Sequence, residues 1–318
     1  MTRALITGIA GQDGSYLADI LLDRGYEVHG LYRHSSKVGL QNVQHNIGNP
    51  KFHLHQGDVT DALCLDRLIE SVDAHEIYHE ADQDNVDWSF KFPAYQMDVT
   101  VKAVMNLLSS VRHHCPSARV FIPCSATMFG NAPAPQDENT PFNPQSPYAC
   151  AKVAAYHIAR MYRQNYGMFV TTGILFNHDS PRRNGNYLLH KICKALVNKT
   201  RITMFDVHQE VAIGYARDYM MHVVNLMQLS YSSDFVIQAA TPITLQALML
   251  FAGVLTEQNH EDVIHCTKST HCTYRSPTLL ANTDKLHNAV GTPDNTDTLD
   301  LLDMIINKYR SEQCVSVQ

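Results

Sequence analysis

Apolar and polar positions along the first half of the chain follow two different rhythms. Short apolar runs such as residues 4–7 are typical of buried strands, whereas residues 14–24 place apolar side chains on one face of a helix. Segments of the two kinds alternate, which predicts a parallel sheet covered by helices on both faces. The predicted strands are 4–7, 27–32, 52–56, 75–79, 118–124 and 168–175, and the predicted helices are 14–24, 61–72, 94–113 and 145–165.

The second half of the chain has a less regular pattern. It contains a predicted strand at 234–240 and predicted helices near 185–198, 244–257 and 297–309. We therefore expect an α/β fold, a doubly wound parallel sheet of the Rossmann type with a smaller C-terminal substrate lobe. The Rossmann domain is predicted to comprise residues 1–175 with a returning segment near 212–242, and the lobe residues 176–211 and 243–318.

The composition argues against several classes of function. The 318 residues carry a net charge of −6, which gives no electrostatic support to binding of nucleic acid or of a membrane surface. No apolar run reaches the roughly 18 residues of a membrane-spanning helix, and the opening "MTRALITG" has the pattern of a strand and not of a signal peptide. Eight cysteines without a framework spacing indicate a reduced, cytoplasmic protein.

One cluster of metal-ligating residue types occurs in "HCTKSTHC" at 265–272. The spacing matches no zinc finger, and the overlapping "DVIH" has the pattern of a strand. We interpret the cluster as surface-loop residues and expect no metal site. Its members are His265, Cys266, His271 and Cys272.

A glycine-rich turn connects the first strand to the first helix. In "TGIAGQDG" (7–14), Gly8, Gly11 and Gly14 allow the backbone to approach a pyrophosphate, and the following helix offers unpaired N–H groups. This context predicts a dinucleotide site that includes Gln12 and Asp13.

The end of the second strand, "GLYRHSS", bears on the choice of dinucleotide. An acidic residue there would hold the ribose 2′-hydroxyl of NAD, but Arg33 stands there with Ser35 and Ser36 beside it. A cation and hydroxyls suit a 2′-phosphate, so we expect NADP. Asp58 and Val59, which follow the third strand, are assigned to the adenine end of the same site.

A second group of residues has the chemistry of hydride transfer. Ser125 ends the strand "VFIPCS", and "SPYACAK" places Tyr148 and Lys152 one helical turn apart. Tyrosine, with an ordinary pKa of about 10, is a poor base at neutral pH unless a nearby cation stabilises the phenolate. Lys152 can supply that charge, and Ser125 can hold the oxygen of a sugar alcohol during its oxidation.

These motifs together resemble the GDP-mannose 4,6-dehydratases, a family of extended short-chain dehydrogenases/reductases. The resemblance is carried by residues 4–36, "NPKFHLHQGD" (49–58), residues 146–168 and "GILFNHDSPRR" (173–183). It implies bound NADP, contacted also by Tyr148 and Lys152, a nucleotide-sugar substrate with GDP-mannose favoured, and a homodimer or homotetramer. It also implies sugar-nucleotide contacts by Asn177, Lys191 and Arg275.

The chain departs from this family at positions that matter for the reaction. The family's catalytic glutamate is Thr127 here, and a substrate-binding arginine is Val211. Thr100 replaces an asparagine, and small neutral residues along the nicotinamide give way to "HEADQDN" (79–85), with Glu80, Asp82 and Asp84.

Threonine is too weak an acid to assist loss of water from C6. Three hypotheses for the function therefore stay open. The protein is a dehydratase with an acid from another strand, a nucleotide-sugar 4-epimerase or 4-ketoreductase, or a catalytically silent nucleotide-binding homologue.

Overall fold

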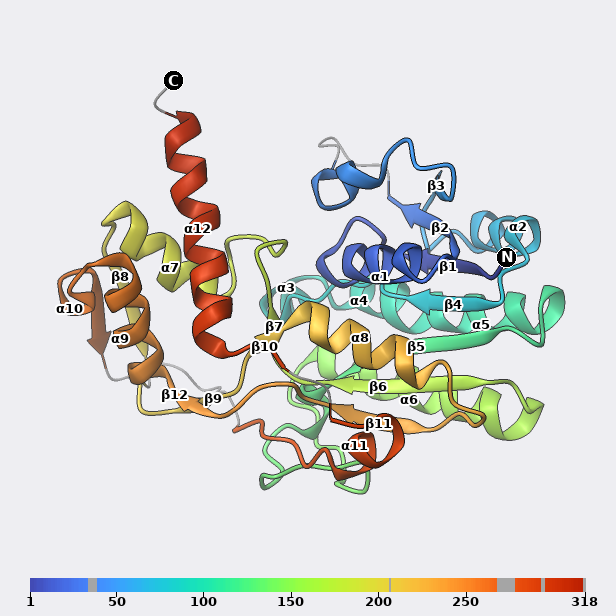
Figure 1. Ribbon diagram of the computed structural model, residues 1–318. Coiled ribbons are helices and arrows are strands. Elements are labelled where there is room, and N and C mark those ends of the chain that lie inside the picture. Colours follow the sequence, from blue (N-terminus) through green and yellow to red (C-terminus); the bar gives the residue numbers. More distant parts are fainter. Residues whose placement is uncertain (34–38, 206, 268–277, 293–294, 317–318) are drawn as a thin grey trace.

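The alternating first half of the chain forms one parallel seven-stranded sheet with the strand order β11-β6-β5-β4-β1-β2-β3 (Figure 1). The computed structural model describes residues 1–33, 39–205, 207–267, 278–292 and 295–316. The strands are β1 (Arg3–Thr7), β2 (Glu27–Tyr32), β3 (Phe52–Gln56), β4 (Glu76–His79), β5 (Arg119–Ser125), β6 (Val170–Leu175) and β11 (Asp234–Ile237).

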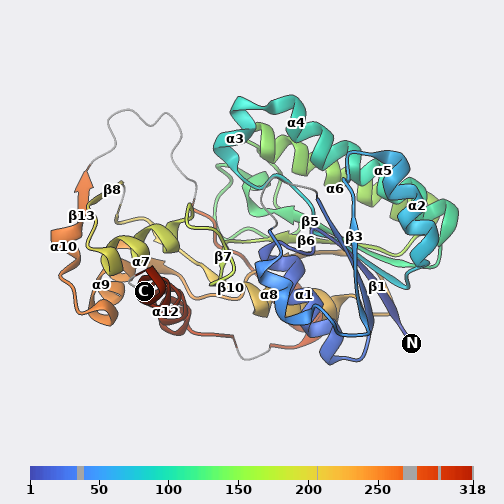
Figure 2. The same cartoon turned by 90° about the horizontal axis from the view of Figure 1, so that it is seen from above.

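Helices cover both faces of this sheet (Figure 2). On one face, α1 (Gln12–Asp23) and α8 (Ala216–Leu226) bury side chains such as Leu17 and Tyr219 against Tyr78 and Phe121 of the sheet. On the other face, α2, α5 and α6 pack over residues such as Ile77 and Val120. These three helices are Ala62–Val72, Ala103–His114 and Pro147–Tyr166. The doubly wound α/β fold is thereby confirmed.

The long helix predicted at 94–113 is divided in the structure. It consists of α4 (Pro93–Met97), a π-helical turn η2 (Asp98–Lys102) and α5, with the short α3 (Val86–Lys91) before them. π-Helical turns occur often at functional sites, and this one carries Thr100, which contacts the candidate site. Two short 3₁₀ turns, η1 (Gln41–Asn46) and η3 (Ala126–Phe129), follow β2 and β5.

A smaller helical layer lies beside the sheet and has its own core, which includes Leu189, Leu248, Leu301 and Ile305 (Figure 1). Its helices are α7 (Leu188–Asn198), α9 (Leu245–Thr256), α10 (His260–Val263) and α12 (Thr298–Ser316). Three two-stranded pairs accompany them: β7 (His178–Asp179) with β10 (Gly214–Tyr215), β9 (Glu210–Val211) with β12 (Ile243–Thr244), and β8 (Ile202–Phe205) with β13 (Ile264–Thr267).

Some segments differ from the sequence pattern. Helix α8 was not among the predicted helices, and "DVIH" (262–265) spans the end of α10 and the start of β13, so only its second half is a strand. The division into domains stays a prediction. Helix α11 (Asp284–Val290), which that division assigns to the lobe, packs against β11 and α8 of the sheet layer.

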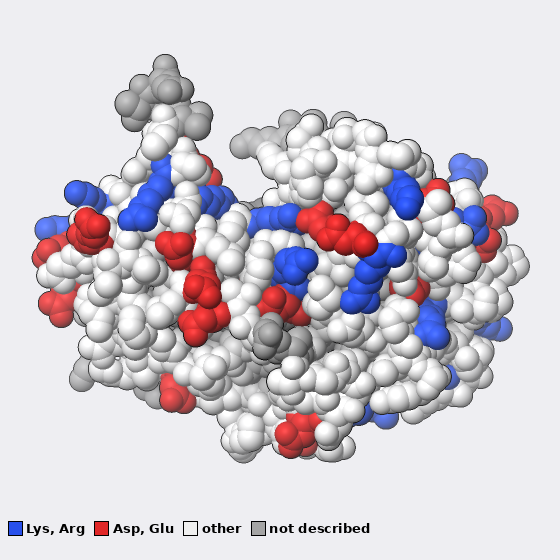
Figure 3. All heavy atoms as spheres, viewed as in Figure 1, with Lys and Arg blue, Asp and Glu red and all other residues white. Residues whose placement is uncertain are grey.

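Charged side chains of both signs are interspersed over the face drawn in Figure 3. Among the helices of the described ranges, none combines the length and the apolar composition that crossing a membrane requires.

Candidate active site

The glycine turn after β1 packs tightly against its surroundings. Gly8 has a φ of +73°, and a Cβ there would lie 2.7 Å from the backbone of Glu80 and Ala81. A Cβ on Gly14 would lie 2.4 Å from the carbonyl oxygen of Gly8. Only glycine fits at either position, so the turn holds the N-terminus of α1 close to the carboxyl ends of β1 and β4.

The side chains at the start of α1 contact the segment that follows β6. Asp13 pairs with His178 at 3.0 Å, and the Ser180 hydroxyl donates to Gln12 at 2.8 Å. Burial would raise the pKa of Asp13, but the His178 cation more than offsets it, so the pKa of Asp13 is lowered and that of His178 is raised. The structure therefore uses these two side chains to join the glycine turn to the start of the smaller lobe.

The other residues expected at the cofactor lie at the ends of β2 and β3. Arg33 is exposed and donates to the Tyr95 hydroxyl of α4 at 2.5 Å. Asp58 accepts hydrogen bonds from the backbone and hydroxyl of Thr60, and Val59 is buried in the core. Ser36 and its neighbour Ser35 lie outside the described residues.

The expected catalytic residues come together at the carboxyl end of β5. The Ser125 and Thr127 hydroxyls lie 2.9 Å apart, because Ser125 caps the 3₁₀ turn that carries Thr127. Tyr148 and Lys152 are both buried and project from α6, whose N-cap is Ser146. The Lys152 Nζ lies 5.8 Å from the centre of the Tyr148 ring. The parallel sheet thus brings the strand-end hydroxyl and the Tyr–Lys helix together.

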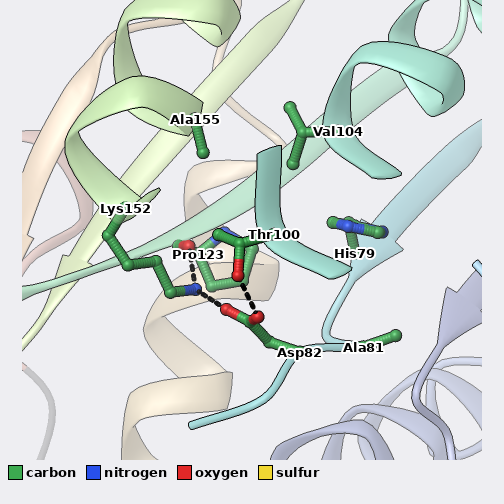
Figure 4. Close-up of a pocket in the computed structure, with 8 residues that line it drawn as sticks. All are labelled: His79, Ala81, Asp82, Thr100, Val104, Pro123, Lys152 and Ala155. Carbon is green, nitrogen blue, oxygen red and sulfur yellow. Dashed lines mark hydrogen bonds and ion pairs between the residues drawn. The ribbon is translucent and has the colours of Figure 1, made fainter. Parts of the chain in front are cut away.

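Lys152 forms a buried ion pair with Asp82, 2.6 Å away in the loop after β4 (Figure 4). The exposed fractions of the two side chains are only 7% and 11%. Lys152 also donates to the Pro123 carbonyl of β5 at 2.8 Å. Burial opposes the charged form of this lysine, but Asp82 more than compensates and raises its pKa. The ammonium group is therefore neutralised by the protein's own carboxylate.

Asp82 is held in turn by the π-helical turn (Figure 4). The Thr100 hydroxyl donates to Asp82 at 2.5 Å and accepts from Gln96 at 2.7 Å. Asp82 and Thr100 both depart from the family pattern, and they are direct contact partners. With His79, they line a small cavity of about 10 Å³, the size of a single water molecule.

The ion pair also affects the pKa of Tyr148. Burial raises the pKa of the phenol to about 12, and the carboxylates of Asp82 and Asp84 add to this rise. Lys152 and the Ser125 hydroxyl act in the opposite direction. Tyr148 therefore remains a protonated phenol at neutral pH in this state of the protein.

The other two acids of the 79–85 run have separate environments. Asp84 pairs with Arg183 at 3.0 Å and accepts from the Tyr187 hydroxyl at 2.8 Å. Burial, together with the nearby carboxylates of Asp13 and Asp82, raises the pKa of Glu80 to about 8. Glu80 is thus a neutral carboxylic acid at pH 7.

The residues assigned to the sugar nucleotide are dispersed along the smaller lobe. Asn177 and Lys191 are exposed, on the segment after β6 and on α7. Val211 belongs to β9, and Arg275 lies outside the described residues, as do His271 and Cys272. His265 and Cys266 are exposed on β13, a strand and not a loop.

Two arginines of "GILFNHDSPRR" have roles in the site that residue types alone did not indicate. Arg182 pairs with Asp19 at 2.6 Å and covers the Tyr16 ring at 4.0 Å, so it fixes the segment against α1. Arg183 covers the Tyr187 ring at 3.5 Å and donates to the His178 carbonyl. The motif could be recognised in the sequence, but the contacts of its two arginines with distant residues could not be predicted from it.

The sheet, the glycine turn and the Ser–Tyr–Lys group define an extended short-chain dehydrogenase/reductase. Solved structures share this fold. UDP-glucuronic acid 4-epimerase from Bacillus cereus is 19% identical with a TM-score of 0.89, over 98% of this chain and 100% of that one. The dTDP-glucose 4,6-dehydratase DesIV from Streptomyces venezuelae is 20% identical with a TM-score of 0.86, over 99% and 98%.

The chain belongs to the GDP-mannose 4,6-dehydratase family, because the family model of that description matches residues 5–291. GDP-mannose 4,6 dehydratase 1 from Arabidopsis thaliana is 36% identical over 88% of this chain and 80% of its own length. Human GDP-mannose 4,6 dehydratase is 39% identical over 74% and 67%, respectively. The chain is therefore a nucleotide-sugar-modifying type of short-chain dehydrogenase/reductase.

We expect Asp82→Asn to destabilise the cofactor-free protein by about 3 kcal/mol, since Lys152 would keep a buried charge without its counter-ion. Asp73→Asn is the control, because Asp73 and its partner Arg3 are 68% and 35% exposed and their pair should contribute about 1 kcal/mol or less. Urea denaturation of the two variants and the wild type measures the difference. Equal losses in both variants would contradict the role given to the buried pair.

Proposed function

We propose that the protein binds NADP and a nucleotide sugar, GDP-mannose in preference, and oxidises the sugar at C4 as the first step of 4,6-dehydration. The observation that carries this proposal is the meeting of Tyr148, Ser125 and Lys152 at the carboxyl end of β5. Membership of the GDP-mannose 4,6-dehydratase family supports the choice of substrate. A cytoplasmic location is part of the same proposal.

The glycine turn fits a dinucleotide. It approaches β4 so closely that a Cβ at Gly8 would clash, and Gly11 starts α1 without a side-chain cap that would compete for the first N–H groups. Gly8, Gly11 and Gly14 would hold the pyrophosphate, and Arg33 the 2′-phosphate. When bound, the nicotinamide accepts a hydride from the sugar carbon.

The chain's own groups manage the proton of the sugar alcohol. Ser125 would hold O4 by a hydrogen bond, and Tyr148 would take its proton as the C–H bond breaks. The Tyr148 pKa of about 12 must fall for this transfer, and the Lys152 ammonium is the nearby charge that lowers it. Asp82 opposes that effect.

Elimination of water across C5 and C6 requires a proton donor that Thr127 does not supply. Two of the three nearby acids are held in ion pairs, Asp82 with Lys152 and Asp84 with Arg183, so Glu80, which is protonated at neutral pH, is the one that could replace it. If Glu80 does not reach C6, the second candidate function is C4 chemistry alone, as in a 4-epimerase or 4-ketoreductase. The neutralised Lys152 favours the third, a silent nucleotide-binding homologue.

We also propose a homodimer or homotetramer. Helices α3 to α6 lie together on one side of the sheet (Figure 2), and they expose large apolar side chains that a monomer would leave in water. The exposed side chains are Trp88, Phe90, Phe92, Tyr95, Met97, Met105, Met161 and Tyr166.

Replacement of Arg33 by alanine should weaken NADPH binding by about 1–3 kcal/mol, the scale of a charge-assisted hydrogen bond, and leave NADH binding nearly unchanged. Fluorescence titration with both dinucleotides measures the two affinities. Arg310→Ala, on α12, is the control. A wild type that binds NADH as tightly as NADPH would exclude the assignment.

Incubation with GDP-mannose in deuterated water, followed by mass spectrometry and chromatographic separation of sugar epimers, distinguishes the three candidate functions. A dehydratase product loses the mass of one water molecule and gains deuterium from solvent, an epimerase product keeps the parent mass but separates from the substrate, and a silent homologue returns only the substrate. We expect chemistry at C4, with loss of water only as far as Glu80 replaces the acid that is missing at position 127. Tyr148→Phe should lower any turnover at least about 100-fold while NADPH binding persists, because the phenol oxygen handles the proton.

The variant Thr127→Glu tests the missing acid directly. If only the acid is lacking, this variant should form the 4-keto-6-deoxy sugar where the wild type does not. Ready formation of that product by the wild type would show that Thr127 does not limit the reaction.

Met105→Lys combined with Met161→Lys should weaken self-association tenfold or more, since a buried unpaired ammonium at an interface costs more than about 1.4 kcal/mol. Light scattering after size-exclusion chromatography measures the mass. Val254→Lys, at a similarly exposed apolar position on α9, is the control. A monomeric wild type would refute the proposed oligomer.

A further inference from the structure

Four polar side chains converge on the edge strand β3 and its neighbour β2, away from the glycine turn. Glu27 and His29 project from one face of β2, and the strand register places His53 and His55 on the same face of its neighbour β3. The strands are parallel, and His29 lies opposite His53 in the register. Neither the cofactor nor the sugar chemistry uses these residues.

Three of these side chains have the spacing of metal ligands. The Glu27 Oε1 lies 3.1 Å from the His53 Nε2 and 3.5 Å from the His29 Nε2. All three atoms lie within 4.8 Å of one another. Donor atoms bound to one tetrahedral zinc ion at 2.0–2.1 Å are separated by about 3.3 Å. One ion therefore fits among them with small side-chain movements.

The two imidazole nitrogens that face Glu27 have no hydrogen-bond partner among the described residues. The Nε2 atoms of His29 and His53 are both shielded from solvent. The other nitrogen of His29, Nδ1, lies 2.9 Å from the His55 Nε2. If His29 Nδ1–H donates to His55, the lone pair of His29 Nε2 points at a carboxylate, an unfavourable contact that a bound cation converts into two ligand bonds.

Arg3, the register partner of Glu27, pairs with Asp73 at 2.8 Å. Glu27 is thereby left to the histidines.

We propose that Glu27, His29 and His53 form a binding site for a divalent transition-metal ion of the zinc class, with His55 orienting His29. Two imidazoles and one carboxylate select such ions over Mg²⁺ and Ca²⁺, which prefer oxygen ligands. The side chains of His53 and Glu27 are 40% and 29% exposed, so the cluster lies near the surface, where an ion can enter from solvent. The ion fastens the edge strand β3 to β2.

Zinc titration of the chelator-treated, full-length protein against a chromophoric competitor tests the site. We expect one zinc ion per chain, and a loss of affinity of about 100-fold or more in His29→Asn/His53→Asn. His55→Gln should weaken binding about 10- to 100-fold, the usual effect of a residue that orients a ligand. Co²⁺ should give the intense visible bands of a tetrahedral site in the wild type only.

Two controls make the result decisive. His265→Asn/Cys266→Ser removes the exposed Cys/His pair of β13, and His114→Asn removes a histidine paired with Asp66 at 3.1 Å without a second histidine ligand. Both should bind zinc as the wild type does. If the double histidine variant fails to fold, the isosteric Glu27→Gln decides by the same titration. Zinc binding that survives loss of the ligands, or that disappears with Cys266, overturns the proposal.

Discussion

The buried ammonium group of Lys152 is the constraint around which the centre of the molecule is arranged. A charge removed from water in this way needs a counter-ion and hydrogen-bond acceptors. Asp82 and the carbonyl of Pro123 supply them, and Thr100 steadies Asp82 from the π-helical turn. One polar network therefore links the loop after β4, the end of β5, the π-helical turn and the helices α4 and α6.

A second set of contacts fixes the position of the smaller lobe. Asp13 with His178, and Asp19 with Arg182, join α1 to the segment that leaves β6. Arg183 extends this connection to Asp84 in the loop after β4. Paired charges thus hold together the glycine turn, the loop after β4 and the first strand of the lobe. The site therefore lies where the sheet layer and the smaller lobe meet.

The fold followed from the sequence because strand and helix periodicities alternate strongly, and the meeting of Ser125 with Tyr148 followed from the geometry of parallel strands. The ion pair of Asp82 and Lys152 did not, since it joins a loop and a helix by side-chain placement that no local pattern encodes. The π-helical turn was not predicted, because the spacing of its apolar residues is also compatible with a continuous α-helix. The histidine cluster depends on the register of β2 and β3, which brings together residues from separate motifs.

The contact between Thr100 and Asp82 has a consequence for how substitutions at these positions combine. Removal of the Thr100 hydroxyl leaves Asp82 with its ion pair to Lys152 and the hydrogen bond from the Gln83 N–H, whereas removal of the Asp82 carboxylate leaves Thr100 with the hydrogen bond from Gln96. The effect of a change at position 82, 100 or 152 therefore depends on which residues occupy the other two.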